Sequence, residues 1–75
     1  MRITVETGKW AARYVNDRAM SIEVPGGATV ADVIRTVGIP ADEAGLAVLG
    51  GNAISNDYSL SDGDVINVHP VIIGG

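Results

Sequence analysis

The fold is decided near the C-terminal end of the chain, by the stretch DGDVINVH, residues 62–69. Glycine between two acidic residues is typical turn composition, because glycine accepts positive φ and aspartate bonds its own backbone. Beyond this turn, apolar Ile66 and Val68 alternate with polar Asn67 and His69. Alternation with a period of two is the mark of a half-buried strand. The sequence therefore predicts a strand that runs from the turn to His69, with the histidine on its outer face.

Two further strands are predicted near the N-terminus. Residues 2–6, RITVE, and 19–24, AMSIEV, both alternate apolar and polar side chains, which indicates a hairpin. The connection between them, residues 7–18, is long for a hairpin. It contains three of the five basic residues and two of the three aromatic residues of the chain, namely Lys9, Trp10, Arg13, Tyr14 and Arg18. Two interpretations stay open: these side chains hold the long loop in place, or they form a second contact surface.

A helix is predicted over residues 30–37, where apolar side chains recur at the spacing of one helical face. Thr29 stands at the N-cap position and Asp32 follows three residues later, which is a shortened capping box. Gly38 and Pro40 end the helix. Its many β-branched residues make it a mediocre helix by propensity, so packing against a sheet must hold it.

The remaining segments predict a connector over residues 41–45 and two short strands, residues 46–49 and 52–54, joined by a Gly-Gly turn. A loop with Leu60 as its inward anchor leads to the last strand. The element order is therefore strand, strand, helix, short strand, short strand, long strand.

This order indicates an α+β fold of the β-grasp, ubiquitin-like type. A helix that follows a hairpin docks across the sheet, and the last strand reaches the first as a parallel neighbour. We expect a mixed sheet of four to five strands packed on one helix. The expected domain covers residues 1–70, and residues 71–75 form an extended tail with a flexible C-terminal Gly-Gly.

Composition narrows the possible functions. The 75 residues include no cysteine, which excludes disulfides and thiolate chemistry, and with a single histidine they offer no familiar metal site. A net charge of −4 disfavours nucleic acid and favours a partner with a basic surface. No apolar run is long enough to span a bilayer and no secretory signal is visible, so we expect a cytoplasmic protein that does not bind membranes.

The Gly74-Gly75 ending is poor structural material, because glycine loses more backbone entropy on ordering than any other residue. It suits a working carboxylate, since backbone without Cβ can thread a narrow channel. From Pro70 to Gly75, six residues can reach about 20 Å when extended, enough to enter a partner's active site. The alternative is that the Gly-Gly ending has no function and is a frayed end or a cloning remnant.

From Leu60 to Gly75 the chain resembles the ubiquitin-like sulfur carriers. This family includes the small subunit of molybdopterin synthase and the carrier of thiamin thiazole synthesis. In the molybdopterin type, an acidic-Gly-acidic turn is similarly followed by an alternating strand, a proline pair, two apolar residues and Gly-Gly. This sequence keeps the first proline as Pro70 and has Val71 where the second is common, and it ends in two glycines where the thiazole type often has three.

The resemblance implies that an E1-like adenylating enzyme uses ATP to join the Gly75 carboxylate to AMP. A persulfide donor then attacks the acyl carbon, and a C-terminal thiocarboxylate results. The tail would enter a larger sulfur-transfer subunit or synthase. Gly75 and Gly74 would form the reacting end. The apolar residues Val71, Ile72 and Ile73 either prolong the core strand or become buried in a partner, and we expect the latter, with Pro70 and His69 as further partner contacts.

The chain itself is expected to be a carrier and not an enzyme. It contains neither a phosphate-binding P-loop nor a dinucleotide fingerprint, and we expect it to bind no cofactor or metal. Ser59 or Ser61 with Asp64 and His69 supplies the residue types of a hydrolytic triad, but nothing in their spacing favours one. Open alternatives are the same carrier chemistry for thiazole or tRNA, a ubiquitin-like modifier of lysines, and an interaction module without tail chemistry.

Overall fold

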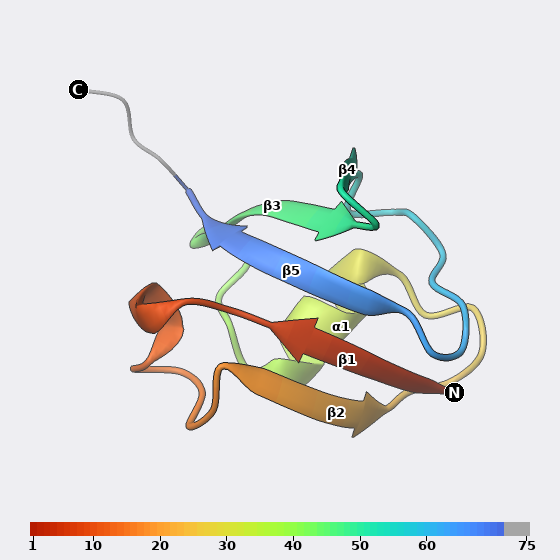
Figure 1. Cartoon of the computed structure of the whole chain (residues 1–75), viewed down its shortest axis with the longest axis horizontal. Helices are drawn as coiled ribbons and strands as arrows, with labels where there is room; N and C mark the ends of the chain where they lie inside the picture. The colour runs from red at the N-terminus through yellow and green to blue at the C-terminus, as the bar shows by residue number, and fades with distance from the viewer. Residues whose placement is uncertain (72–75) are drawn as a thin grey trace.

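The computed structural model describes residues 1–71. Five strands, one α-helix and one short 3₁₀ helix make up this part of the chain (Figure 1). In chain order they are β1 (Arg2–Glu6), η1 (Lys9–Ala11), β2 (Ala19–Glu23), α1 (Val30–Val37), β3 (Ala44–Leu49), β4 (Asn52–Ile54) and β5 (Val65–Pro70). The predicted element order is confirmed, and no helix of residues 1–71 has the length and apolar character needed to cross a membrane.

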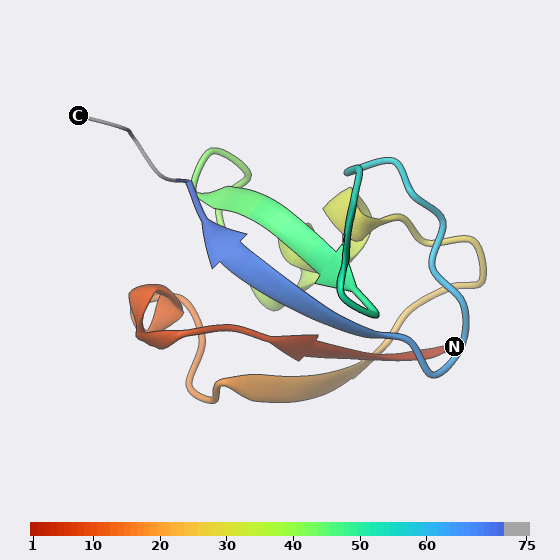
Figure 2. The same ribbon diagram turned by 45° about the horizontal axis from the view of Figure 1, so that its top comes forward.

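The strands form one mixed sheet in the order β2-β1-β5-β3-β4. β1 and β5 are parallel, with Thr4 opposite Val65, whereas the other neighbours are antiparallel. Figures 1 and 2 show the twisted sheet with α1 lying across one of its faces. The α+β, β-grasp prediction is therefore confirmed, including the parallel pairing of the last strand with the first.

The core lies between α1 and the central strands. Six large side chains are fully buried there: Ile3 and Val5 of β1, Ile66 and Val68 of β5, and Val30 and Val33 of α1. Each strand contributes alternate residues, as the period of two predicts. Leu60 is also buried, in keeping with its predicted role as an inward anchor.

The start of α1 has the predicted capping box. The backbone N–H of Asp32 donates to Thr29 Oγ1 at 3.2 Å, and the backbone N–H of Thr29 donates to Asp32 Oδ2 at 3.0 Å. At the other end, Gly38 adopts a left-handed conformation with φ of 91°. These caps satisfy backbone groups that the short helix leaves free, and they fix where it begins and ends.

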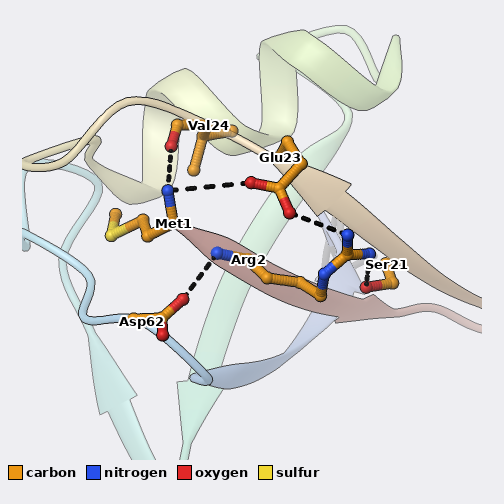
Figure 3. Close-up of polar contacts among 6 residues, drawn as sticks. All are labelled: Met1, Arg2, Ser21, Glu23, Val24 and Asp62. Carbon is orange, nitrogen blue, oxygen red and sulfur yellow. Dashed lines mark hydrogen bonds and ion pairs between the residues drawn. The ribbon is translucent and has the colours of Figure 1, made fainter.

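A network at the N-terminus sets where β5 begins. The backbone N–H of Arg2 donates to Asp62 Oδ1 at 2.7 Å, and the backbone N–H of Gly63 donates back to Arg2 O at 2.8 Å. Figure 3 shows the Arg2 guanidinium reaching in turn to Glu23 and Ser21 of β2. The DGD turn is thus tied to both strands of the first hairpin.

The structure differs from the sequence prediction at two connections. β3 begins at Ala44, inside the expected connector, because the end of β5 offers those residues a pairing partner. The long loop of residues 7–18 contains η1, and it buries Ala11 and Val15 in the core. Its Trp10 also packs against the core, so the loop is partly held in place by its own apolar side chains.

Candidate functional site

The candidate site is the C-terminal end of β5, here called the exit. β5 is a central strand, with β1 on one side and β3 on the other. Its pairing with β1 runs from Val65 to Asn67, whereas its pairing with β3 continues to Pro70. Because β1 and β5 are parallel, the loop of residues 7–18 lies at the same end of the sheet as this exit (Figure 1).

Backbone contacts with the start of β3 and with the residue before it hold the end of β5 in place. The backbone N–H of Val71 donates to Glu43 O at 3.0 Å, one residue beyond the end of β5. Pro70 lies opposite Ala44 and is half-buried. A proline lacks an N–H, and it fits here because its pairing with β3 lies at the irregularity between Ala44 and Leu46.

Gly45 allows β3 to lie very close to the backbone of Pro70 and Val71. It lies where the register of β3 against β5 shifts, between Ala44 and Leu46. A Cβ on Gly45 would come within 2.6 Å of Pro70 O and 2.8 Å of Val71 Cα. No real side chain tolerates such distances, so only glycine lets β3 pass this close to the exit.

The face of the sheet opposite α1 presents apolar side chains beside the exit. His69 lies opposite Leu46 in the β3–β5 pairing, and both side chains are exposed. Leu46 is 46% exposed and Val71 45%. Large exposed apolar side chains near one another mark candidate contact surfaces. We call Leu46, His69 and Val71 the outer patch.

The structure places three of the seven predicted site residues. His69 lies on the outer face as predicted, and Pro70 and Val71 lie at the exit. Ile72, Ile73, Gly74 and Gly75 lie outside the described residues. One expectation needs correction: Pro70 is paired with Ala44 of β3 and the backbone N–H of Val71 is bonded to Glu43 O, so these two residues do not contribute to a free extended reach of six residues.

The structure does not assemble the triad residue types. Asp64 directly precedes β5 and its carboxylate accepts the backbone N–H of Ser61 at 2.8 Å. His69 lies near the opposite end of β5, about 16 Å along an extended strand. Among the described residues there is also no group of His, Cys, Asp and Glu side chains that could hold a metal ion.

Sequence reasoning missed the two residues that support the exit, Gly45 and Glu43. One available signal was a glycine at the start of the apolar run LAVL, because glycine inside a strand often marks a bulge or a close backbone approach. The role of Glu43 is carried by its backbone carbonyl, which any residue supplies, so its identity gave no signal.

The sheet order, the single crossing helix and the central exit strand define a ubiquitin-like β-grasp protein. The family model for the Mut7-C ubiquitin matches residues 2–73. This match spans nearly the whole chain, and the chain belongs to that family. The expected relationship to ubiquitin-like proteins is thus confirmed.

Solved structures share the fold. Small archaeal modifier protein 1 from Haloferax volcanii is 17% identical, with 95% of this chain and 98% of that chain covered and a TM-score of 0.76. A putative molybdopterin converting factor, subunit 1, from Pyrococcus furiosus is 22% identical, with 96% and 99% covered and a TM-score of 0.75. A complex of subunits 1 and 2 of the molybdopterin-converting factor from Helicobacter pylori matches at 17% identity, full coverage of both chains and a TM-score of 0.59.

Proposed function

We propose that this chain is a cytoplasmic sulfur carrier whose Gly75 carboxylate is activated by a separate adenylating enzyme and converted to a thiocarboxylate for molybdopterin synthesis. The observation that carries the proposal is the exit of a central strand, held by Glu43 and Gly45 and flanked by the outer patch. The fold shared with a molybdopterin converting factor subunit supports it.

The chemistry explains why a carrier needs an activating partner. A carboxylate is ionised near neutral pH and is a poor electrophile. In the proposed first step, a Gly75 oxygen attacks the α-phosphorus of ATP, and pyrophosphate leaves. The resulting acyl adenylate has AMP as a good leaving group. The terminal sulfur of a persulfide attacks its carbonyl carbon and AMP departs, which leaves an acyl disulfide.

A thiol of the sulfur donor or the adenylating enzyme completes the conversion. It attacks the sulfur atom that belongs to the donor and breaks the S–S bond of the acyl disulfide. The donor is left as a disulfide with the attacking thiol, and the carrier leaves as a thiocarboxylate. In this scheme the chain supplies the acyl group and the docking surfaces, and its partners supply ATP, the persulfide and the thiol. The chain binds no cofactor or metal of its own, and a larger subunit would receive the thiocarboxylate.

The experiment is a mass measurement. The chain is incubated with the E1-like adenylating enzyme of its source organism, ATP and a persulfide donor, and the intact mass is recorded. We expect a gain equal to the exchange of one oxygen for one sulfur. An unchanged mass, with an adenylating enzyme that is active on its own known carrier, contradicts the proposal.

Deletion of Gly75 is the matched variant for this assay. The five strands, the helix and the buried core all lie within residues 1–71. We expect unchanged urea unfolding and no sulfur incorporation. Incorporation at the wild-type rate would show that the Gly75 carboxylate is not the acceptor.

A second candidate is a protein modifier that forms an isopeptide with target lysines. The fold shared with small archaeal modifier protein 1 favours it. Both functions begin with adenylation of the same carboxylate, and they separate at the product. Covalent adducts between this chain and lysines of other proteins would favour the modifier, whereas a free thiocarboxylate favours the carrier.

A further inference from the structure

The loop of residues 7–18, here called the basic loop, is built as a distinct feature beside the exit. Its ends are closed by a hydrogen bond from the backbone N–H of Thr7 to Arg18 O at 2.7 Å. Because β1 runs parallel to β5, the basic loop follows β1 at the end of the sheet where β5 releases the C-terminal segment (Figure 1). A partner that takes in this segment must face the basic loop.

Charge is segregated between the basic loop and the rest of the chain. The basic loop holds three cations and Asp17, a net charge of +2. The other residues hold two cations and eight acids, a net charge of −6, which together give the −4 of the chain. Such an arrangement creates a local positive field on an acidic protein.

The cations also differ in their partners. Outside the basic loop, Arg2 pairs with Glu23 at 2.8 Å and Arg35 with Asp32 at 2.7 Å. The three cations of the basic loop are exposed, and none has a carboxylate of residues 1–71 within ion-pair distance: Lys9, Arg13 and Arg18. Their charges are therefore available to an incoming acidic group.

A small cavity under the basic loop adds a specific feature. It has a volume of about 140 Å³, and Lys9, Arg18, Asp17 and Thr7 are among its lining residues. Thr7 Oγ1 is buried and has no hydrogen-bond partner among the described residues, and its burial closes it off from an incoming ligand atom. The lining groups that can meet an acidic ligand are therefore the exposed side chains of Lys9 and Arg18.

The aromatic side chains of the basic loop do not offer a platform for bases. Trp10 and Tyr14 are half-buried and pack against the core. Binding of single-stranded nucleic acid without sequence preference depends on exposed rings on which bases stack. The net charge of −4 also opposes a polyanion. These observations favour a protein partner over RNA.

We propose that the basic loop is a docking surface for an acidic surface around the entrance of the partner site that receives the C-terminal segment. One carboxylate of that surface enters the cavity, where it pairs with Lys9 and Arg18. The inference rests on the proposed function for the identity of the partner. It adds a second contact, separate from the outer patch, that orients the carrier and speeds its association.

A pair of double variants tests the charge contribution in the adenylation assay. Arg13→Ser with Arg18→Ser removes two cations of the basic loop, and Arg2→Ser with Arg35→Ser removes two cations elsewhere, so both variants have the same net charge. We expect the first to lower kcat/KM about tenfold at low ionic strength, with the gap closing as salt screens it. Equal effects of the two variants would overturn the proposal.

A peptide experiment keeps the docking surface testable even if the chain is not a substrate of the adenylating enzyme. Amide chemical shifts are followed while hexaglutamate or hexauridylate is added to the full chain. We expect hexaglutamate to shift amides of residues 7–18 at low salt and hexauridylate to shift them less. No shifts with hexaglutamate, shifts confined to other elements, or tighter binding of the RNA would each overturn the proposal. A silent adenylation assay would instead contradict the proposed function.

Discussion

At the scale of single residues, one glycine lets two backbone segments meet. That glycine is Gly45, because a Cβ there would overlap backbone atoms of Pro70 and Val71. Backbone atoms cannot swing aside as a flexible side chain does. The exit segment therefore depends on the absence of one methyl group on a neighbouring strand.

Gly45→Ala should accordingly destabilise the fold. We expect a loss of about 1–3 kcal/mol in the free energy of unfolding, the range for an inserted methyl group in a well-packed site. Urea unfolding measures the loss, and the amide shift of Val71 reports the displacement of the exit. Gly26→Ala is the control, because a Cβ at Gly26 meets no atom within 4 Å. Equal stabilities of the two variants would show that β3 can move away without cost.

Asp32 is the residue whose ionisation the fold changes. The backbone N–H of Thr29, then the Arg35 side chain, donate hydrogen bonds that hold the pKa of Asp32 below its ordinary value. A lowered folded-state pKa stabilises the fold above the unfolded-state pKa, and this contribution is lost as the pH falls through the folded-state pKa.

Asp32→Asn should therefore remove part of the acid sensitivity of the protein. We expect the wild type to lose more stability than the variant as the pH is lowered below about 4, the ordinary range of an aspartate. Urea unfolding at pH 7 and in acid measures the difference. Asp42→Asn, which removes an exposed loop carboxylate, serves as the control. A parallel loss in the wild type and in Asp32→Asn would contradict the linkage.

At the scale of elements, sequence patterns predicted the helix ends and strand ranges that depend on residues close together in the sequence. The helix begins at Val30 and ends at Val37 as predicted, because Thr29, Asp32 and Gly38 are capping residues whose effect is confined to one turn. β1 and β4 likewise match their predicted ranges. Alternation and capping depend on neighbours in sequence, so they can be read without tertiary structure.

The elements that were missed depend on partners distant in the sequence. Ala44 joins β3 because Pro70 lies opposite, and Ala11 becomes buried because the core offers space under the basic loop. The same limit applies to the site. His69 could be placed on the outer face from its own strand, whereas the contact of Glu43 with Val71 joins backbone atoms of two segments far apart in the sequence, which no local pattern shows.

At the scale of the whole molecule, one face of the sheet packs against the helix and the other face is exposed. α1 covers one face and closes the core, while the other face carries the outer patch beside the exit. The exit and the basic loop lie at one end, and the polar network of the N-terminus lies at the other (Figures 1 and 3). The proposed recognition features thus gather at the end of β5, apart from the features that hold the fold.

This separation predicts that Leu46→Gln lowers recognition without lowering stability. Leu46 is already 46% exposed on the outer patch, so its loss should change the free energy of unfolding by no more than about 0.5 kcal/mol. Burial of its remaining surface by a partner contributes about 1 kcal/mol. We therefore expect kcat/KM for adenylation to fall about five- to tenfold.

Tyr58→Gln is the matched control for Leu46→Gln. Tyr58 is 42% exposed, but it lies in the loop between β4 and β5 that leads to the opposite end of the sheet. If both variants lowered kcat/KM equally, recognition would follow general surface hydrophobicity, and the outer patch would lose its assigned role.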